Sequence, residues 1–104
     1  MTKHKTARGF PFISFKDFYE RDCSVQISSL ADEMCIWVGL DGAEPKVLAK
    51  NAAKYGIKTN ETTGWVPFPV PDEVLLSTKM HLNTKQVKDL IKVLQKWVDT
   101  GEIY

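Results

Sequence analysis

The sequence is poor in the side chains on which most catalytic and metal centres depend. Its 104 residues include only two histidines, His4 and His81, and two cysteines, Cys23 and Cys35. A tetrahedral zinc site needs further cysteine or histidine pairs. No serine or cysteine lies in a recognisable nucleophile motif, and no glycine-rich phosphate-binding loop occurs. We therefore interpret the chain as a non-enzyme and expect no catalytic residue, no metal and no cofactor.

An excess of charge and a long apolar run are also absent. The chain carries 14 Lys and Arg against 13 Asp and Glu, a net charge of +1. This balance excludes an acidic, DNA-mimicking surface and gives no global attraction to nucleic acid. No stretch is long and apolar enough to cross a membrane, and no secretory signal is present. The two cysteines are expected to stay reduced, although a disulfide between them is possible. The sequence is therefore typical of a cytoplasmic protein without a membrane partner.

The composition itself is that of a globular protein, with 43% hydrophobic and 26% charged residues. This length supports one modest core, so we predict a single domain over residues 1–104. Residues 1–9 are basic and lack periodic apolar side chains. We interpret them as a flexible basic tail.

The strongest local signal is a helix between Leu82 and Gly101. Asn83 is a favourable N-cap, and Gln86 three positions later completes a capping box. Gly101 suits the left-handed position at which helices end. Apolar residues recur at three- and four-residue steps and share one face: Val87, Leu90, Ile91, Leu94, Trp97 and Val98. A helix face this apolar requires a partner surface.

Segments with a period of two predict the strands. They cover residues 12–16, 23–28 and 35–40, and a fourth segment, 74–82, leads directly into the helix. Cys23 and Cys35 lie on strands expected to be neighbours and could face each other. The predicted fold is α+β: an antiparallel sheet of about four strands with the C-terminal helix packed on one face.

Residues 44–71 interrupt this alternation and form an insertion before the last strand. Pro45 and Gly56 are typical of the first residue and the end of a short helix, which we predict over residues 45–55. The following segment, 59–71, carries prolines at alternate positions. Prolines remove backbone donors and favour an extended chain, so this segment is predicted to be a stiffened loop.

Large aromatic side chains on this loop are the best candidates for binding. A stiff loop loses little conformational entropy when its side chains meet a partner. We predict a partner-binding surface that comprises Trp65, Phe68, Trp37 and Tyr55. In a competing interpretation, Trp65 and Phe68 fold back to cover Trp37 and its neighbour on the sheet. A third interpretation is a homo-oligomer formed through the same apolar sheet face.

Basic side chains give an alternative function, the binding of a nucleotide or nucleic acid. The candidates are Lys3, Lys5 and Arg8 in the tail and Lys88, Lys92 and Lys96 on the helix. Such a row could follow a phosphate backbone. However, Asp89 and Asp99 interrupt it, and no aromatic pair is interleaved for base stacking. A solvated helix surface is the simpler interpretation.

Three stretches of the chain carry a family resemblance. They are FKDFYERDCSVQISSLA from Phe15 to Ala31, IWVGL from Ile36 to Leu40, and KMHLNTKQVKDLIKVLQKWVDTGE from Lys79 to Glu102. Together they resemble a family of small proteins encoded by bacteriophages and prophages. The shared motifs are structural, so no site residue is transferred. The resemblance implies a phage accessory protein that binds and inhibits a host protein, for example a host-defence inhibitor of the anti-CRISPR type.

Overall fold

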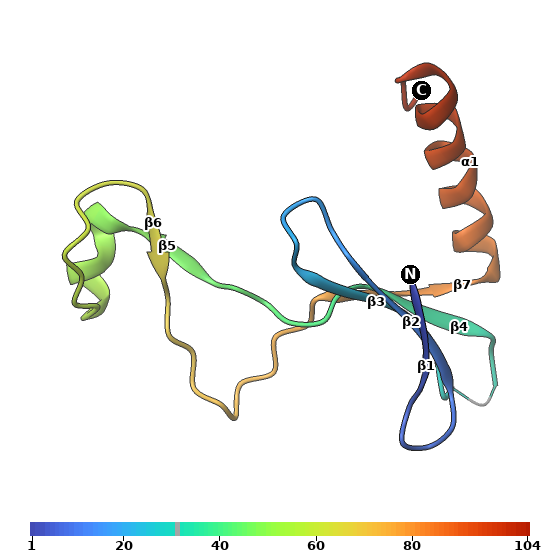
Figure 1. Ribbon diagram of the computed structural model, residues 1–104, viewed down its shortest axis with the longest axis horizontal. Helices are drawn as coiled ribbons and strands as arrows, with labels where there is room; N and C mark the ends of the chain where they lie inside the picture. Colours follow the sequence, from blue (N-terminus) through green and yellow to red (C-terminus); the bar gives the residue numbers. More distant parts are fainter. Residues whose placement is uncertain (31) are drawn as a thin grey trace. The chain divides into compact units, whose positions relative to one another are not determined.

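The chain consists of two compact units, seen in the computed structural model (Figure 1). Unit 1 comprises Met1–Asp41 and Thr78–Tyr104, and unit 2 comprises Gly42–Ser77. The structure describes residues 1–30 and 32–104. Ala31, which ends the first stretch of the family resemblance, lies outside the described residues.

Unit 1 is a five-stranded antiparallel sheet followed by a helix. Its strands are hydrogen-bonded in the order β1 (Thr2–Lys5), β2 (Pro11–Lys16), β3 (Asp22–Ile27), β4 (Cys35–Leu40) and β7 (Lys79–Asn83). Helix α1 spans Thr84–Thr100. The α+β class and the antiparallel sheet predicted from the sequence are thereby confirmed. Because β4 and β7 are paired neighbours, unit 2 occupies the place of a hairpin loop between them.

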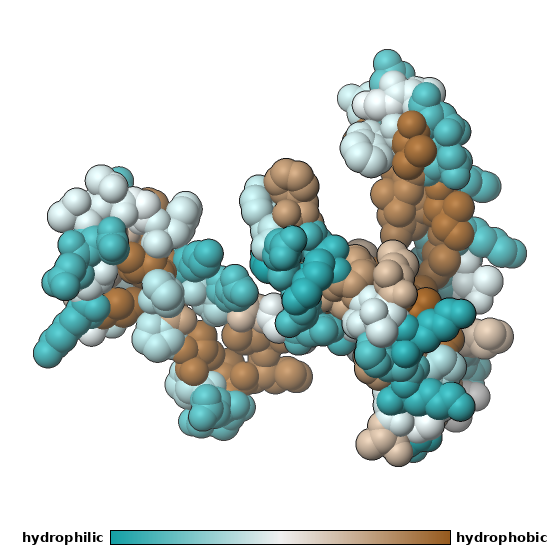
Figure 2. Space-filling view, in the orientation of Figure 1, coloured by the Kyte–Doolittle hydropathy of each residue, from teal (hydrophilic) through white to brown (hydrophobic). Residues whose placement is uncertain are grey.

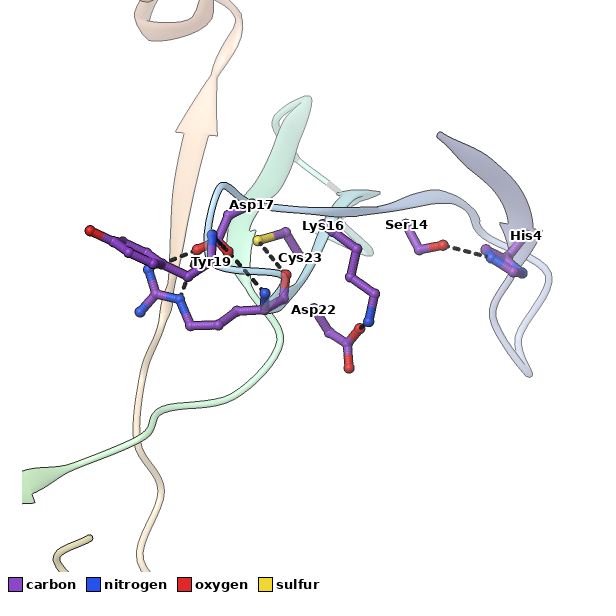
Figure 3. Close-up of polar contacts among 8 residues, drawn as sticks. His4, Ser14, Lys16, Asp17, Tyr19, Asp22 and Cys23 are labelled. Carbon is purple, nitrogen blue, oxygen red and sulfur yellow. Dashed lines mark hydrogen bonds and ion pairs between the residues drawn. The ribbon is translucent and has the colours of Figure 1, made fainter. Parts of the chain in front are cut away.

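The basic N-terminal segment belongs to this sheet, so the prediction of a flexible tail is wrong. β1 pairs with β2 from Thr2↔Ser14 to Lys5↔Pro11. His4 stacks on Phe12 with ring centroids 4.8 Å apart, and its Nε2 lies 2.8 Å from Ser14 Oγ (Figure 3). An edge strand pairs on one side only and tolerates polar side chains. The apolar periodicity used for prediction therefore could not reveal it.

Asp17 organises the turn between β2 and β3 (Figure 3). Its carboxylate accepts hydrogen bonds from the backbone N–H groups of Tyr19 and Arg21, both at 2.9 Å, and from Arg21 Nε at 2.7 Å. These bonds lower the pKa of Asp17 from its ordinary value, the backbone N–H of Arg21 contributing most. Lys16 and Asp22, opposite each other in the register, add an ion pair.

The two faces of the sheet differ in polarity. Cross-strand partners share a face and successive residues alternate. One face, which we call the apolar face, carries Ile13, Phe15, Cys23, Val25, Ile27, Ile36, Val38, Leu40, Met80 and Leu82, with Lys3 and Lys5 at its β1 edge. The opposite, polar face carries His4, Phe12, Ser14, Ser24, Gln26, Trp37, Lys79 and His81.

Helix α1 does not cover the apolar face, so the predicted packing of helix on sheet is wrong for the single chain. Among the strands α1 contacts chiefly β7, which directly precedes it, and none of its residues is buried. The reason lies in the junction. Asn83 is the last residue of β7 and also the N-cap of α1. No connecting residues remain in which the chain could turn back onto its own sheet.

The ends of α1 follow the predicted signals. Asn83 Oδ1 accepts a hydrogen bond from the Gln86 N–H at 2.9 Å, and Gln86 Oε1 accepts one from the Asn83 N–H at 3.0 Å. At the other end Gly101 adopts a φ of 77° and its N–H donates to the Trp97 carbonyl at 2.8 Å. The capping box and the glycine stop are therefore confirmed.

The two cysteines do not face each other, although this was one possibility on neighbouring strands. The antiparallel register places Cys23 opposite Leu40, and Cys35 opposite Asn83 of β7. Both thiols are free. Strand β7 is also shorter than the predicted strand 74–82, because the residues before Thr78 belong to unit 2.

Unit 2 is a two-stranded ribbon with a short 3₁₀ helix. Strand β5 (Lys46–Leu48) pairs with β6 (Trp65–Pro67), and the 3₁₀ helix η1 (Ala49–Tyr55) follows β5. The predicted helix over 45–55 thus begins later, after a strand, and the predicted loop 59–71 contains a strand. Two backbone hydrogen bonds extend the ribbon, from the Ala49 N–H to the Gly64 carbonyl and from the Phe68 N–H to the Pro45 carbonyl. A small core of Ala49, Ala52 and Val66 holds unit 2 together.

Candidate binding surfaces

Trp65 is the most exposed large aromatic side chain of unit 2, at 66%. It lies on β6 opposite Leu48 of β5. The next residue, Val66, is buried in the core with Ala49 and Ala52. Alternation along the ribbon therefore directs Trp65 outward while Val66 fixes the strand beneath it.

A hollow of about 680 Å³ adjoins Trp65. Pro67 and Pro69 stiffen one part of its wall, and Lys58 and Glu61 add charges of both signs. An exposed indole beside a preformed hollow is a common arrangement in surfaces that bind another molecule. We call Trp65 and this hollow the Trp65 surface.

Tyr55 and Phe68 form a separate aromatic pair in unit 2. Their rings meet edge to face, with centroids 5.5 Å apart and an interplanar angle of 72°. Phe68 is half-buried, and the hydrogen bond from its N–H to Pro45 continues the ladder of the ribbon. By alternation Phe68 shares the inward side with Val66, whereas Trp65 points outward. The predicted surface therefore divides between the two sides of the ribbon.

Trp37, the fourth predicted binding residue, belongs to the polar face of unit 1. Its ring stacks on that of His81, with centroids 3.9 Å apart and an interplanar angle of 13°. His81 Nε2 lies 2.9 Å from Ser28 Oγ, which holds the imidazole in place. The partner of Trp37 within its own unit is thus a histidine from the neighbouring strand β7.

The predicted basic residues lie on two separate elements. Lys3 and Lys5 are exposed on β1, and the Arg8 guanidinium lies 5.7 Å from the centroid of the Phe10 ring. Lys88, Lys92 and Lys96 are exposed on α1, which follows β7. Strands β1 and β7 are opposite edges of a five-stranded sheet, about 19 Å apart at the usual strand spacing. The two groups therefore do not form one continuous patch.

A second hollow, which was not predicted from the sequence, lies at the base of α1. It measures about 420 Å³ and is lined by apolar side chains from the sheet, the β3–β4 connection and the helix: Ile27, Leu30, Met34, Ile36, Leu82 and Val87. Asp32, Glu33 and Lys88 are charged members of the lining. Desolvation raises the pKa of the Cys35 thiol there, and the Glu33 and Asp32 carboxylates raise it further. The one sequence signal for this hollow is that the last strand ends at Asn83, the residue that also caps the helix.

Known proteins do not identify these surfaces, because no protein-family model, curated protein or solved structure matches the chain. Within residues 1–30 and 32–104, no group of three or more His, Cys, Asp or Glu could hold a metal ion. Over the same ranges, no helix has the length and apolarity needed to span a membrane. The Trp65 surface and the apolar surfaces of unit 1 are therefore interpreted from their own geometry.

Proposed function

We propose that this chain is a non-enzymatic accessory protein that binds another protein through the Trp65 surface. The observation that supports this proposal is the exposure of Trp65 on a ribbon whose opposite side is fixed by the buried Val66. Tryptophan is among the residues most enriched at the centres of protein interfaces. A side chain on a backbone that is already ordered also costs less entropy to immobilise.

The family resemblance supplies the setting for this proposal. In a phage-infected cell the partner would be a cytoplasmic host protein. The chain would inhibit that protein by binding it, as a host-defence inhibitor of the anti-CRISPR type does. Charges of both signs beside Trp65, Lys58 and Glu61, suit the polar rim of a protein interface. They suit a phosphate backbone less well, since that ligand attracts positive charge alone.

Affinity capture from a bacterial host tests this proposal. The wild-type chain is expected to retain one host protein in a stoichiometric complex, and Trp65→Ala should weaken that complex by about 30-fold, the usual loss for a central anchor. Phe18→Ala is the matched control, because Phe18 is an aromatic residue 93% exposed in the β2–β3 turn of unit 1. Equal binding by Trp65→Ala and wild type, or no retained protein, would contradict the proposal.

A nucleotide or nucleic acid is the second candidate ligand. The observation in its favour is that β1 fixes Lys3 and Lys5 on one side of an exposed edge strand. Such binding should weaken steeply as the salt concentration rises, and the double change Lys3→Glu, Lys5→Glu should abolish it. Titration with oligonucleotides and cyclic nucleotides at two salt concentrations measures this. Absent or salt-independent binding would remove the candidate.

A further inference from the structure

Unit 1 leaves two extensive apolar surfaces uncovered. On the apolar face of the sheet only Cys23 is buried, while Ile27 and Met80 are 43% and 50% exposed. On α1, Ile91 and Trp97 are each 57% exposed. Figure 2 shows the apolar side chains of the helix as a continuous brown stripe. Within one chain, no helix covers the apolar face of the sheet, and no sheet lies against the apolar side of α1.

The accessible surface of the chain exceeds that expected for compact units of the same size. The accessible surface is 8793 Å² for 11.8 kDa, whereas a compact monomer of that mass exposes about 5,900 Å². Even two separately compact units of the sizes found here would expose only about 7,000 Å². The excess surpasses the roughly 800 Å² that each partner buries in a standard protein interface. The surplus, which the two units share, is about twice what one partner contributes to such an interface.

The junction between β7 and α1 prevents the simplest remedy, a helix folded back on its own sheet. Asn83 has extended backbone angles, φ −85° and ψ 177°, and passes directly into the first helical turn. The capping box with Gln86 fixes the helix start at that residue. Chains that reverse direction between packed elements normally use several connecting residues. Short hinges of this kind favour exchange of an element with a second copy.

We infer that unit 1 forms a twofold exchanged dimer in which α1 of each chain lies across the apolar face of a second copy. Each chain supplies one apolar helix and one apolar sheet face, so reciprocal exchange covers both surfaces and closes the assembly. The dimensions agree. Seventeen residues of α1 make a helix about 25 Å long, and five strands are about 19 Å across. The 420 Å³ hollow at the base of α1 lies where the two apolar surfaces of one chain meet.

The charges of α1 make the helix less stable on its own. The helix has no acidic residue in its first turn and no basic residue in its last. Lys85 and Lys88 lie near its positive N-terminal pole and Asp99 near its negative C-terminal pole, an order that the helix's own dipole disfavours.

Lengthening the hinge is the decisive experiment. A six-residue Gly-Ser linker inserted between Leu82 and Asn83 moves the helix together with its capping box, and allows α1 to reach its own sheet. In analytical ultracentrifugation of the full chain at tens of micromolar, wild type should sediment as a dimer and the insertion variant as a folded monomer. A monomeric wild type overturns the inference. A variant that stays dimeric overturns the exchange, because association would then use another surface.

Two further measurements separate exchange from other outcomes. Leu94→Lys, on the apolar stripe, should weaken dimerisation by at least about 100-fold. Gln95→Lys should not, because Gln95 lies about 100° around the helix from Leu94 and outside the stripe. In a mixed sample of ¹³C-labelled and unlabelled chains, isotope-filtered contacts between Leu94 and Val38 methyl groups should appear between chains. Contacts confined to one chain would overturn the exchange. Trp65→Ala should leave the dimer intact, so this inference and the proposed function can fail independently.

Discussion

Gly39 is the residue at which the sheet tolerates least change. Its φ of 145° lies outside the range of residues with a side chain. A Cβ placed there would lie 2.9 Å from the Thr78 carbonyl oxygen and 3.1 Å from Lys79 Cα, both backbone atoms of the neighbouring chain segment. The close approach of β4 to the start of β7 therefore depends on the absence of a side chain.

Gly39→Ala is expected to lower the free energy of unfolding by about 2 kcal/mol, the usual cost of a non-glycine residue in such a conformation. Urea denaturation measures the loss. Gly42→Ala is the control, because Gly42 has no positive φ and a Cβ there meets no atom within 4 Å. Equal stability of the two variants would show that β4 and β7 can separate slightly without cost.

Asp17 makes the stability of unit 1 depend on pH. Its hydrogen bonds lower the pKa of the carboxyl in the folded state below the unfolded value, which is about 3.9. The ionised carboxylate therefore stabilises the fold above that value, and this contribution is lost as the pH falls through the folded pKa. Asp17→Asn should lower the melting temperature at pH 7 and flatten its decline below pH 4. An unaltered acid profile in the variant would contradict this assignment.

Among the secondary-structure elements, the segments with strong local signals were predictable from the sequence. Strands β2, β3 and β4 and helix α1 each carry an apolar period or a cap, and the structure places them close to their predicted bounds. Strand β1 has no apolar residue, and β5 and β6 have three residues each, too few to establish a period. Their pairing depends on backbone hydrogen bonds with distant segments, which the local sequence does not encode.

For α1, the sequence predicted the chemistry of the partner surface but not its location. The apolar stripe correctly required a partner surface, but nothing in the period indicates whether that surface is on the same chain. The junction at Asn83 decides the question, since β7 leaves no residues for a reversal of direction. A connection must be counted, in addition to the elements it joins, before a helix is assigned to a sheet.

Asn83→Ala is expected to destabilise α1 by about 1 kcal/mol. The Gln86 N–H loses the Asn83 Oδ1 acceptor, and the reciprocal bond from the Asn83 N–H to Gln86 Oε1 is no longer supported. The loss should appear as reduced helical circular dichroism and a lower midpoint in urea. Asn83→Ser keeps an oxygen acceptor at the cap and should recover most of the loss. If alanine and serine have the same effect, the contribution of Asn83 comes from the sheet and the cap is unimportant.

At the scale of the whole chain, composition and length indicated one modest core, whereas the structure divides the chain into two units with separate apolar contacts. The core of unit 2 contains two alanines and a valine, which are too few and too small to stand out in a composition. The predicted binding residues divide accordingly, with Trp37 in unit 1 and the other three in unit 2. The sequence identified the aromatic residues but could not indicate which of them lie together.

Replacement of residues 42–77 by an Asn-Gly turn is expected to leave unit 1 folded. β4 and β7 are already paired antiparallel neighbours with Gly39 opposite Lys79. The new loop Asp41-Asn-Gly keeps this register, and its glycine suits the left-handed position of a three-residue hairpin loop. The entropy cost of closing a loop depends only weakly on its length. The free energy of unfolding of the variant should therefore stay within about 2 kcal/mol of the value for the full chain. Urea unfolding at matched protomer concentration measures this. Loss of a cooperative transition would show that unit 2 supports the sheet.

The position of unit 2 as the loop of the β4–β7 hairpin has an evolutionary consequence. Both of its ends join unit 1 at adjacent, paired strands, so a longer, shorter or unrelated segment could replace it without disturbing any other strand connection. Selection for a new target could then act on residues 42–77 while the sheet and helix drift slowly. In related genomes we expect recombination and rapid substitution to concentrate in this interval.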